Sequence, residues 1–215
     1  MIPKKLHQIW LGNQDKRPIE WMDSWKDKHP TWEYRLWTEA DFQDLADTPG
    51  FKRLSYSGQS DVLRYQILYE HGGVYVDADS ECLRPIDDLL DNEAFCVWEN
   101  EYVTTGLMLG AFMGTVPNNP FFEALLDEIG NQPTLEPEWF TVGPGLFTRM
   151  IGKLKYTGMH IYPSHYFSPK HHTGLEYKGK DKPYANHFWD NTAKLTSTIT
   201  KEGFEYRPVD NDILT

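Results

Sequence analysis

Cysteine is scarce in this chain, which has 215 residues but only two cysteines, Cys82 and Cys96. Two isolated cysteines give neither the paired spacing of a structural zinc site nor the framework of a disulfide-rich domain. The sequence therefore favours a protein of a reducing compartment.

Long apolar runs and targeting signals are also missing. The longest apolar stretch, residues 107–116, has about half the length of a membrane span and is interrupted by glycines. The opening segment MIPKKLHQIW contains too few apolar residues for the core of a signal peptide. We expect no integral membrane segment in this chain.

Positive charge is in deficit, with 21 Lys and Arg against 32 Asp and Glu and a formal net charge of −11. This balance argues against nucleic acid as a partner, because nucleic-acid phosphates require a basic face. It leaves open a small phosphorylated ligand, whose charge a metal ion can neutralise locally. Eight Trp and twelve Tyr are numerous for this length, and their flat faces serve either core packing or stacking on a ligand.

The most informative stretch runs from Ser57 to Ser80. Ser60 is a candidate N-cap for a helix whose apolar positions recur with helical spacing. His71-Gly72-Gly73 ends this helix, since glycine accepts a left-handed backbone without strain. The β-branched and aromatic residues 74–76 then predict a short central strand.

Two carboxylates, Asp77 and Asp79, follow this strand. Residues two apart in an extended chain share a face, and ligands of open α/β sheets bind at the carboxyl ends of strands. Neighbouring carboxylates repel unless a cation lies between them, and hard oxygen ligands suit Mn²⁺ or Mg²⁺. The pair therefore predicts a metal site. The alternative is a solvated turn, where most Asp-x-Asp triplets occur.

A second candidate constellation precedes the strand. Asp61 and Arg64 are three residues apart and share a face of the expected helix, with Asp61 in its first turn. Spacing alone is equally compatible with an ordinary ion pair on a helix surface.

The order of elements predicts an α/β fold with a Rossmann-like, mixed but mostly parallel sheet flanked by helices. Up to Asp79 the order is β-α-β-α-α-β. A Thr38–Asp41 capping box is expected to open a helix to about residue 46. The other elements are expected as strands at 6–11, 32–37, 94–98 and 107–113, and as helices at 18–28, 49–56, 85–90 and 120–129.

The pattern S-D-x-L-R-x-x-x-L-x-x-x-G-G-x-Y-x-D-x-D resembles the signature of DxD glycosyltransferases with the GT-A fold. The group it resembles contains fungal Golgi mannosyltransferases, bacterial capsular-polysaccharide transferases and short transferases of large viruses; clostridial toxin glucosyltransferase domains share the spacing. The opening IPKKLHQIWLG is similar to the same group. The matched positions are Ser60, Asp61, Leu63, Arg64, Leu68, Gly72, Gly73, Tyr75, Asp77 and Asp79.

The resemblance implies a single catalytic domain over residues 1–215, with a nucleotide-binding half at about 1–92 and an acceptor and closing half at about 93–215. It implies a metal-dependent, retaining hexosyltransferase that uses Mn²⁺ or Mg²⁺. The partners would be a nucleotide-sugar donor, with a UDP-sugar favoured over a GDP-sugar, and a glycan or glycoconjugate acceptor. Golgi members of the group carry an N-terminal anchor, which is not seen in this sequence; we therefore expect a cytoplasmic location, or a soluble catalytic module of a longer protein.

The resemblance also assigns nucleotide-binding and donor-binding residues. Trp10 would stack on the nucleobase while the backbone of Ile9 reads the base edge; the alternative for Trp10 is core packing. Asp61 and Arg64 would hold hydroxyls of the donor sugar. Ser60 and Tyr75 are included in the donor-binding set as matched positions of the signature.

The metal set implied by the resemblance is Asp77, Asp79 and His187, with His187 also a candidate phosphate ligand. The group has an H-x-W element followed by Ser or Thr and Trp; here His187 and Trp189 match, and Ala193 replaces the second Trp.

Three segments leave alternatives open. Thr141-Val142-Gly143-Pro144-Gly145 resembles a T-G-P element beside the donor, but Val142 separates its threonine from its glycine, and plain tight packing would explain both glycines. Residues 99–101 (Glu-Asn-Glu) end an expected strand and would either face the sugar or be solvated. His165, His171 and His172 are expected on the surface of a loop that contains Pro and Lys.

Two other functions compete. Haloacid-dehalogenase-type phosphatases also place D-x-D after a buried strand and use the first Asp as a nucleophile, and Ser80 makes the local match tolerable. A lectin-like module would explain the aromatic residues but not the set of Asp61, Arg64, Asp77 and Asp79. Phosphate release, or sugar binding without nucleotide, would identify these alternatives.

Overall fold

The computed structural model describes residues 1–42 and 50–189. Its elements alternate between strand and helix through the first half of the chain, as the sequence predicts. The strands and α-helices are β1 (Lys5–Ile9), α1 (Ile19–Lys28), β2 (Glu33–Trp37), α2 (Tyr56–His71), β3 (Gly73–Val76), β4 (Ser80–Cys82), β5 (Ala94–Trp98), β6 (Met108–Thr115), α3 (Pro120–Gly130), α4 (Glu138–Thr141), α5 (Pro144–Leu154), β7 (Met159–Tyr162) and β8 (Ala185–His187). Short 3₁₀ helices lie at Gln14–Lys16, Glu39–Asp41, Phe51–Arg53, Asp87–Leu89 and Ser164–Tyr166.

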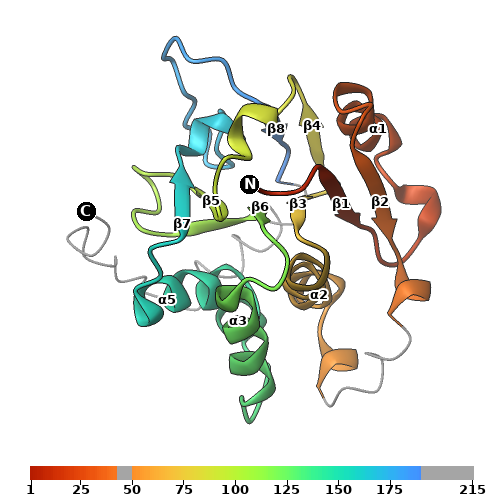
Figure 1. Ribbon diagram of the computed structural model, residues 1–215, viewed down its shortest axis with the longest axis vertical. Coiled ribbons are helices and arrows are strands. Elements are labelled where there is room, and N and C mark those ends of the chain that lie inside the picture. Colours follow the sequence, from red (N-terminus) through yellow and green to blue (C-terminus); the bar gives the residue numbers. More distant parts are fainter. Residues whose placement is uncertain (43–49, 190–215) are drawn as a thin grey trace.

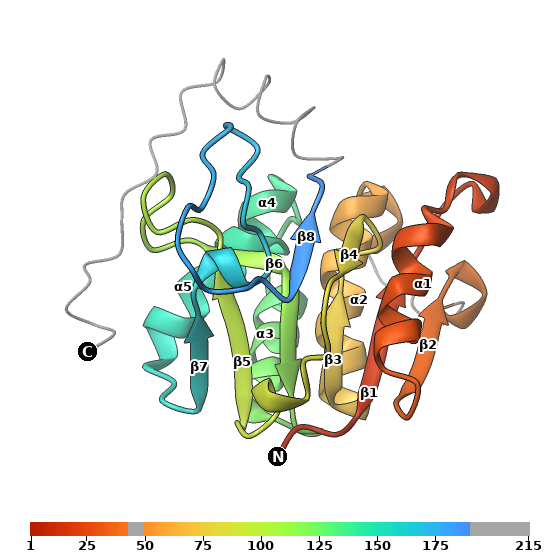
Figure 2. The ribbon, with the colours of Figure 1, turned by 90° about the horizontal axis from the view of Figure 1, so that it is seen from above.

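Six strands form one sheet in the order β2-β1-β3-β6-β5-β7 (Figure 2). The β1–β2, β1–β3 and β5–β7 pairings are parallel, whereas β6 runs antiparallel to both of its neighbours. The expected mixed, mostly parallel α/β sheet is confirmed. Since β1 and β3 run in the same direction, their carboxyl ends lie at one edge of the sheet, which is where ligands of such folds bind.

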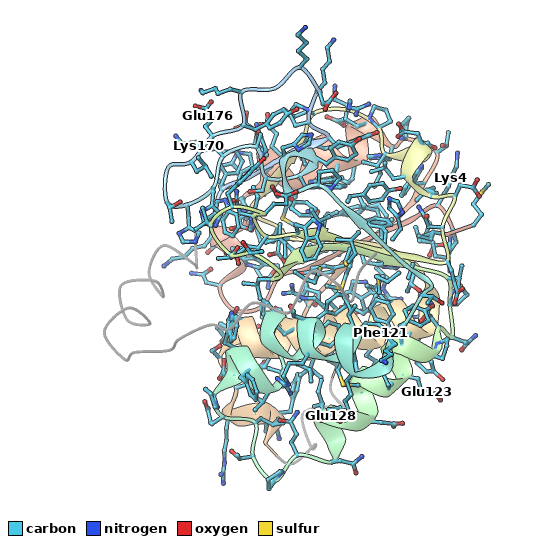
Figure 3. The ribbon with its side chains drawn as sticks, turned by 90° about the vertical axis from the view of Figure 1, so that its left-hand side faces the viewer. Lys4, Phe121, Glu123, Glu128, Lys170 and Glu176 are labelled. Carbon is cyan, nitrogen blue, oxygen red and sulfur yellow. The ribbon has the colours of Figure 1, made fainter. Side chains whose placement is uncertain are left out.

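Side chains of β3 alternate between two apolar cores. Tyr75 packs with α2, α3 and α5 on one face, whereas Val74 and Val76 pack with Trp25 of α1 and with later loops on the other. Figure 1 shows α2, α3 and α5 together below the sheet. Buried Phe121 of α3 lies inside the helical layer, while exposed Glu123 lies at the rim (Figure 3). A strand with both faces covered is apolar along its whole length, as residues 74–76 are.

A second, two-stranded sheet brings the end of the described chain back to β3. Strand β4 follows Asp79 directly and pairs antiparallel with β8, so that Ser80 lies opposite His187. Trp25 of α1 holds Ser80 in place, since its indole nitrogen donates to the carbonyl and to the hydroxyl of Ser80, at 3.0 and 3.1 Å. The β4–β8 pairing therefore sets the distance between Asp79, which precedes β4, and His187 at the end of β8.

The expected N-cap of α2 was wrong. The helix begins at Tyr56 rather than after Ser60, and the side chain of Ser55 caps it by accepting from the Gly58 N–H. Glu138 of α4 accepts the Ser55 N–H at 2.6 Å, a contact over 83 positions that local patterns do not show. At the other end, Gly72 and Gly73 have φ of 60° and 97°, which confirms the glycine turn.

The other expected elements are found with shifts of a few residues at their ends. The Thr38–Asp41 capping box is present and opens a 3₁₀ turn, Glu39–Asp41. The continuation of this helix to residue 46 lies outside the described residues, as does the start of the connecting helix expected at 49–56, of which the 3₁₀ turn Phe51–Arg53 is described. Within the described ranges, no helix combines the length and the apolar character needed to cross a bilayer.

Candidate active site

Asp77 and Asp79 extend from the carboxyl end of β3, where the sequence placed them. The Tyr75 hydroxyl donates to Asp77 Oδ1 at 2.7 Å, and Gln8 of β1 donates to the Asp77 carbonyl at 3.5 Å. Tyr75 itself is 2% exposed. Tyr75 therefore orients Asp77 through this hydrogen bond and has little exposed surface with which to contact a donor.

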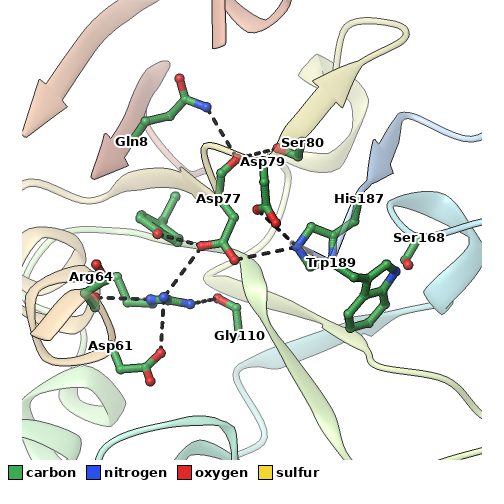
Figure 4. A network of polar contacts seen from close by, with 12 residues as sticks. Gln8, Asp61, Arg64, Asp77, Asp79, Ser80, Gly110, Ser168, His187 and Trp189 are labelled. Atoms are coloured by element: carbon green, nitrogen blue, oxygen red, sulfur yellow. Dashed lines mark hydrogen bonds and ion pairs between the residues drawn. The ribbon is translucent and has the colours of Figure 1, made fainter. Parts of the chain in front are cut away.

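His187 reaches the same point from β8. Its Nε2 lies 3.7 Å from Asp77 Oδ2 and 3.4 Å from Asp79 Oδ1, and one ligand atom from each of the three residues lies within 4.8 Å of the others (Figure 4). Two carboxylates and one imidazole form an oxygen-rich donor set that suits Mn²⁺ or Mg²⁺. The residues expected to hold a metal thus lie together and fit the ion.

Arg64 connects this cluster to Asp61. Its Nη2 lies 3.1 Å from Asp61 Oδ1 and 3.6 Å from Asp77 Oδ1. Its other nitrogens donate to the carbonyls of Ser60 and Gly110, so the guanidinium is fixed on every side (Figure 4). The ion pair expected from the spacing of Asp61 and Arg64 is confirmed, but it is buried rather than on the helix surface.

Burial and pairing shift the ionisation of these groups in opposite directions. Burial raises the pKa of Asp61 to about 7 despite the pairing with Arg64. Burial alone would also raise the pKa of Asp77, but Arg64, His187 and the Tyr75 hydroxyl outweigh it and hold this pKa well below its ordinary value. His187 is affected in the other sense, since contacts with Asp77 and Asp79 overcome its burial and raise its pKa to about 9.

Gly143 allows α5 to approach the Asp61–Arg64 pair. A Cβ at this position would lie 2.9 Å from Asp61 Oδ2, closer than non-bonded atoms approach. The segment opens α5 as the T-G-P resemblance implies, with Pro144 in the first turn. The hydroxyl of Thr141 is engaged within its own segment, where it lies 2.6 Å from the Leu135 carbonyl and 3.0 Å from the Pro137 carbonyl as a shared donor.

The nucleotide-binding residues expected at the start of the chain lie at the carboxyl end of β1. Ile9 is buried, and Trp10 is half-buried with its indole nitrogen donating to the Asn13 carbonyl at 3.0 Å. A pocket of about 140 Å³ is lined by Leu11, which follows Trp10 in sequence, and by Phe51, Lys52, Gln59 and Leu63 among others; Ile9 and Trp10 are not in its lining.

A second cluster of potential ligands was missed by sequence reasoning. Glu99 is buried at the end of β5, and its Oε1 lies 3.3 Å from His171 Nε2 and 3.7 Å from His172 Nε2. Burial alone would raise the pKa of Glu99, but contacts with both imidazoles and Thr104 outweigh it and lower this pKa. The surface position expected for His171 was wrong, because this side chain is 2% exposed. The adjacent His-His pair was the signal that could have indicated it.

Trp189 lies between the two clusters. Its ring centroid is 4.5 Å from that of His187, 5.1 Å from that of His171 and 5.2 Å from that of His172. Its indole nitrogen donates to the Lys170 carbonyl at 3.0 Å. The H-x-W element thus places its Trp against both histidine groups. Ala193 lies outside the described residues.

Comparisons with known proteins agree with this geometry. Residues 15–96 match the family described as glycosyltransferase sugar-binding region containing DXD motif. Inositol phosphoceramide mannosyltransferase 2 of Schizosaccharomyces pombe is 33% identical over 143 residues, which cover 60% of this chain and 39% of that protein. Mannosyl phosphorylinositol ceramide synthase SUR1 of Saccharomyces cerevisiae is 33% identical, over 57% of this chain and 33% of its own length. The chain thus spans well under half the length of these relatives.

The solved structures of similar fold are also glycosyltransferases. The PaToxG glycosyltransferase has a TM-score of 0.59 at 19% identity and covers 71% of this chain and 70% of its own. A glycosyltransferase involved in glycosylation of the major capsid of PBCV-1 has a TM-score of 0.55 at 10% identity, covering 93% of this chain and 98% of its own. At these identities the likeness shows the fold alone. Residues 15–96 are thus similar to the DXD-containing sugar-binding region of glycosyltransferases, and the fold of the chain is the GT-A fold.

Proposed function

We propose that this chain is a metal-dependent glycosyltransferase that moves a hexose from a nucleotide-diphosphate sugar to a glycan or glycoconjugate acceptor with retention of anomeric configuration. One observation carries the proposal: residues 61, 64, 77 and 79 of one segment meet residue 187, from a distant part of the chain, at the carboxyl edge of the sheet. The division into a nucleotide-binding half at about 1–92 and an acceptor half at about 93–215 is part of this proposal.

Asp77, Asp79 and His187 would hold a divalent cation, Mn²⁺ or Mg²⁺. Such an ion supplies charge neutralisation to the departing diphosphate. The chain's own contribution is a fixed cluster. Tyr75 and Arg64 hold Asp77 from one side, and the pairing of β4 with β8 holds His187 opposite. A cluster that is already oriented needs little reorganisation when charge develops.

Asp61 and Arg64 would position the donor sugar. Arg64 is held by two carboxylates and two backbone carbonyls, which fixes the orientation of its guanidinium. The close approach of Gly143 leaves no room for a side chain beside Asp61. A hydroxyl of the donor sugar bound by Asp61 or Arg64 would fix the ring for attack by the acceptor at the anomeric carbon, which lowers the entropic part of the barrier.

The nucleobase would occupy the region of Ile9 and Trp10, next to the pocket of about 140 Å³. The spacing of the signature favours UDP, as in toxin-like transferases. The mannosyltransferase names of the relatives favour GDP, because mannose is commonly activated as GDP-mannose. Both nucleotides are therefore included in the test.

The acceptor would approach from the opposite side of the site. A cleft of about 390 Å³ opens beside the ends of β5 and β7, and its lining includes Asn100, Tyr102, His165, Ser168 and Tyr177. Aromatic side chains, of which Tyr102 is 86% exposed, offer flat faces on which sugar rings can stack. The relatives' names describe an inositol phosphoceramide acceptor for those proteins, which suggests a glycoconjugate acceptor here.

Calorimetric binding of UDP and GDP, each with and without Mn²⁺, tests the proposal on the wild type and on Asp79→Asn. We expect one of the two nucleotides to bind only with the metal, and the substitution to abolish that binding. Metal-dependent binding of UDP but not of GDP would direct the donor search to UDP-sugars. Binding of GDP but not of UDP would direct it to GDP-mannose. If neither nucleotide binds in the presence of metal, the assignment of the site is wrong.

A further inference from the structure

Glu99, His171 and His172 form a second cluster of ligand atoms, separate from the pair of aspartates. One ligand atom from each of the three residues lies within 4.8 Å of the others. Glu99 directly follows β5, whereas both histidines come from a loop some seventy residues later. A contact between two distant segments that consists of three potential metal ligands calls for an explanation beyond packing.

Two of the distances between the ligand atoms are close to those around a tetrahedral ion. Ligands about 2.0–2.2 Å from a tetrahedral zinc lie about 3.3–3.6 Å from one another. The two Nε2–Oε1 distances here are 3.3 Å to His171 and 3.7 Å to His172. Little movement would therefore be needed to admit the ion.

One atom of the cluster lacks a hydrogen-bond partner. Glu99 Oε2 is buried and accepts no hydrogen bond from the described residues, while the whole residue is 8% exposed. A buried carboxylate oxygen without a partner is costly, and each such group requires an explanation. A cation that Glu99 binds through both of its carboxylate oxygens would supply the missing partner of Oε2.

The loop is built to present both histidines. The Lys170–Glu176 bridge closes it, and the His171 N–H donates to the Leu175 carbonyl at 2.8 Å. His171 Nδ1 lies 2.8 Å from the Thr173 hydroxyl and accepts the Thr173 N–H at 3.3 Å, so two polar groups of Thr173 orient the ring with Nε2 towards Glu99. Such an outer partner typically orients metal-binding histidines.

We propose that Glu99, His171 and His172 bind a zinc ion that joins the loop of residues 170–176 to the end of β5. Two imidazoles and one carboxylate are a donor set that favours Zn²⁺ over Mg²⁺, in contrast to the oxygen-rich cluster of Asp77 and Asp79. Three protein ligands leave a fourth position for water.

This second site would act on the first through Trp189. The indole contacts all three histidines of the two clusters and donates to the Lys170 carbonyl within the loop. An ion that fixes this loop would therefore also fix Trp189 beside His187. The inference goes beyond the proposed function and does not depend on the identity of the donor.

Zinc binding by the chelator-treated Asp79→Asn variant tests the proposal, because this background impairs the aspartate cluster. We expect one Zn²⁺ per chain by calorimetry, undiminished by a large excess of Mg²⁺. Adding His172→Ala should weaken this binding more than about 100-fold, since loss of an outer-shell partner alone costs 10–100-fold. Glu99→Gln in the same background should have a similar effect without changing side-chain size.

His165→Ala is the matched control, because His165 belongs to the same region, stacks on Tyr177 at 3.8 Å and is not part of the cluster. Its zinc affinity should be unchanged. Thermal unfolding shows whether each variant folds, and Co²⁺ absorption gives a second readout, with tetrahedral bands expected only when the cluster is intact. The absence of Zn²⁺ binding in Asp79→Asn, or binding that survives both His172→Ala and Glu99→Gln, would overturn the proposal. Neither result would affect the nucleotide-binding test of the aspartate cluster.

Discussion

Replacing Arg64 by Met tests whether the buried charge network stabilises the apo fold. The Arg64 side chain is about 6% exposed, and its guanidinium lies 3.1 Å from Asp61 and 3.6 Å from Asp77. Met retains most of the apolar stem but removes the charge, which leaves Asp61 without its cation and Asp77 with His187 as its remaining cationic partner. It also removes the donors to the carbonyls of Ser60 and Gly110.

The expected loss in the free energy of unfolding is about 3–5 kcal/mol, the usual cost of removing one partner from a buried ion pair. For a protein with an unfolding free energy of about 5–15 kcal/mol this is a large fraction. Urea denaturation in the absence of metal, followed by tryptophan fluorescence, measures it as a shift of the midpoint at constant slope.

Arg35→Met is the matched control. Arg35 pairs with Asp41 at 2.9 Å, but its side chain is 46% exposed, so the pair is screened by solvent. Its loss should cost under about 1 kcal/mol. If Arg64→Met costs no more than Arg35→Met, the argument that Arg64 compensates the two buried carboxylates is refuted.

Two further predictions concern the packing around the site. His7 is buried between the Gly72 carbonyl and the Trp37 indole N–H, and burial lowers its pKa from 6.5 to about 4. The contribution of neutral His7 to the free energy of unfolding is therefore complete above pH 6.5 and is lost as the pH falls towards 4. The loss amounts to up to about 3 kcal/mol. His7→Gln should flatten the acid limb of the stability curve measured by urea denaturation, and an unchanged slope would contradict this. Gly143→Ala should displace the Asp61 carboxylate and lower nucleotide-sugar turnover at least about 10-fold. Gly152→Ala is the control, because no atom lies within 4 Å of the added Cβ, and it should leave turnover unchanged. Equal turnover in the two variants would show that the close approach of Gly143 to Asp61 has no role.

Local patterns in the sequence predicted the part of the site that lies within one segment. Helix α2, its glycine turn and β3 follow one another directly, so Asp77 and Asp79 could be placed at a strand end from periodicity alone. The start of α2 could not be placed, because Glu138 contacts the N-terminus of this helix from a distant segment.

The residues that meet across long distances were predicted less completely. His187 was assigned by resemblance to an H-x-W element, and its distance from Asp79 depends on the pairing of β4 with β8. The burial of His171 was not foreseen, since a loop that contains Pro and Lys looks solvated when its packing partner, Glu99, is unknown. The composition of a segment does not show which distant residues pack against it in the folded chain.

Release of nucleoside diphosphate from GDP-mannose and from UDP-hexoses in the presence of Mn²⁺ tests the central claim most directly. For one donor class we expect the wild type to release the diphosphate, and Asp79→Asn to do so at least about 100-fold more slowly, as is typical when a group that stabilises developing charge is removed. Release by Asp79→Asn at the wild-type rate would contradict the account. So would release of inorganic phosphate from sugar phosphates, or sugar binding without any nucleotide, since a phosphatase or a lectin would then explain the cluster better.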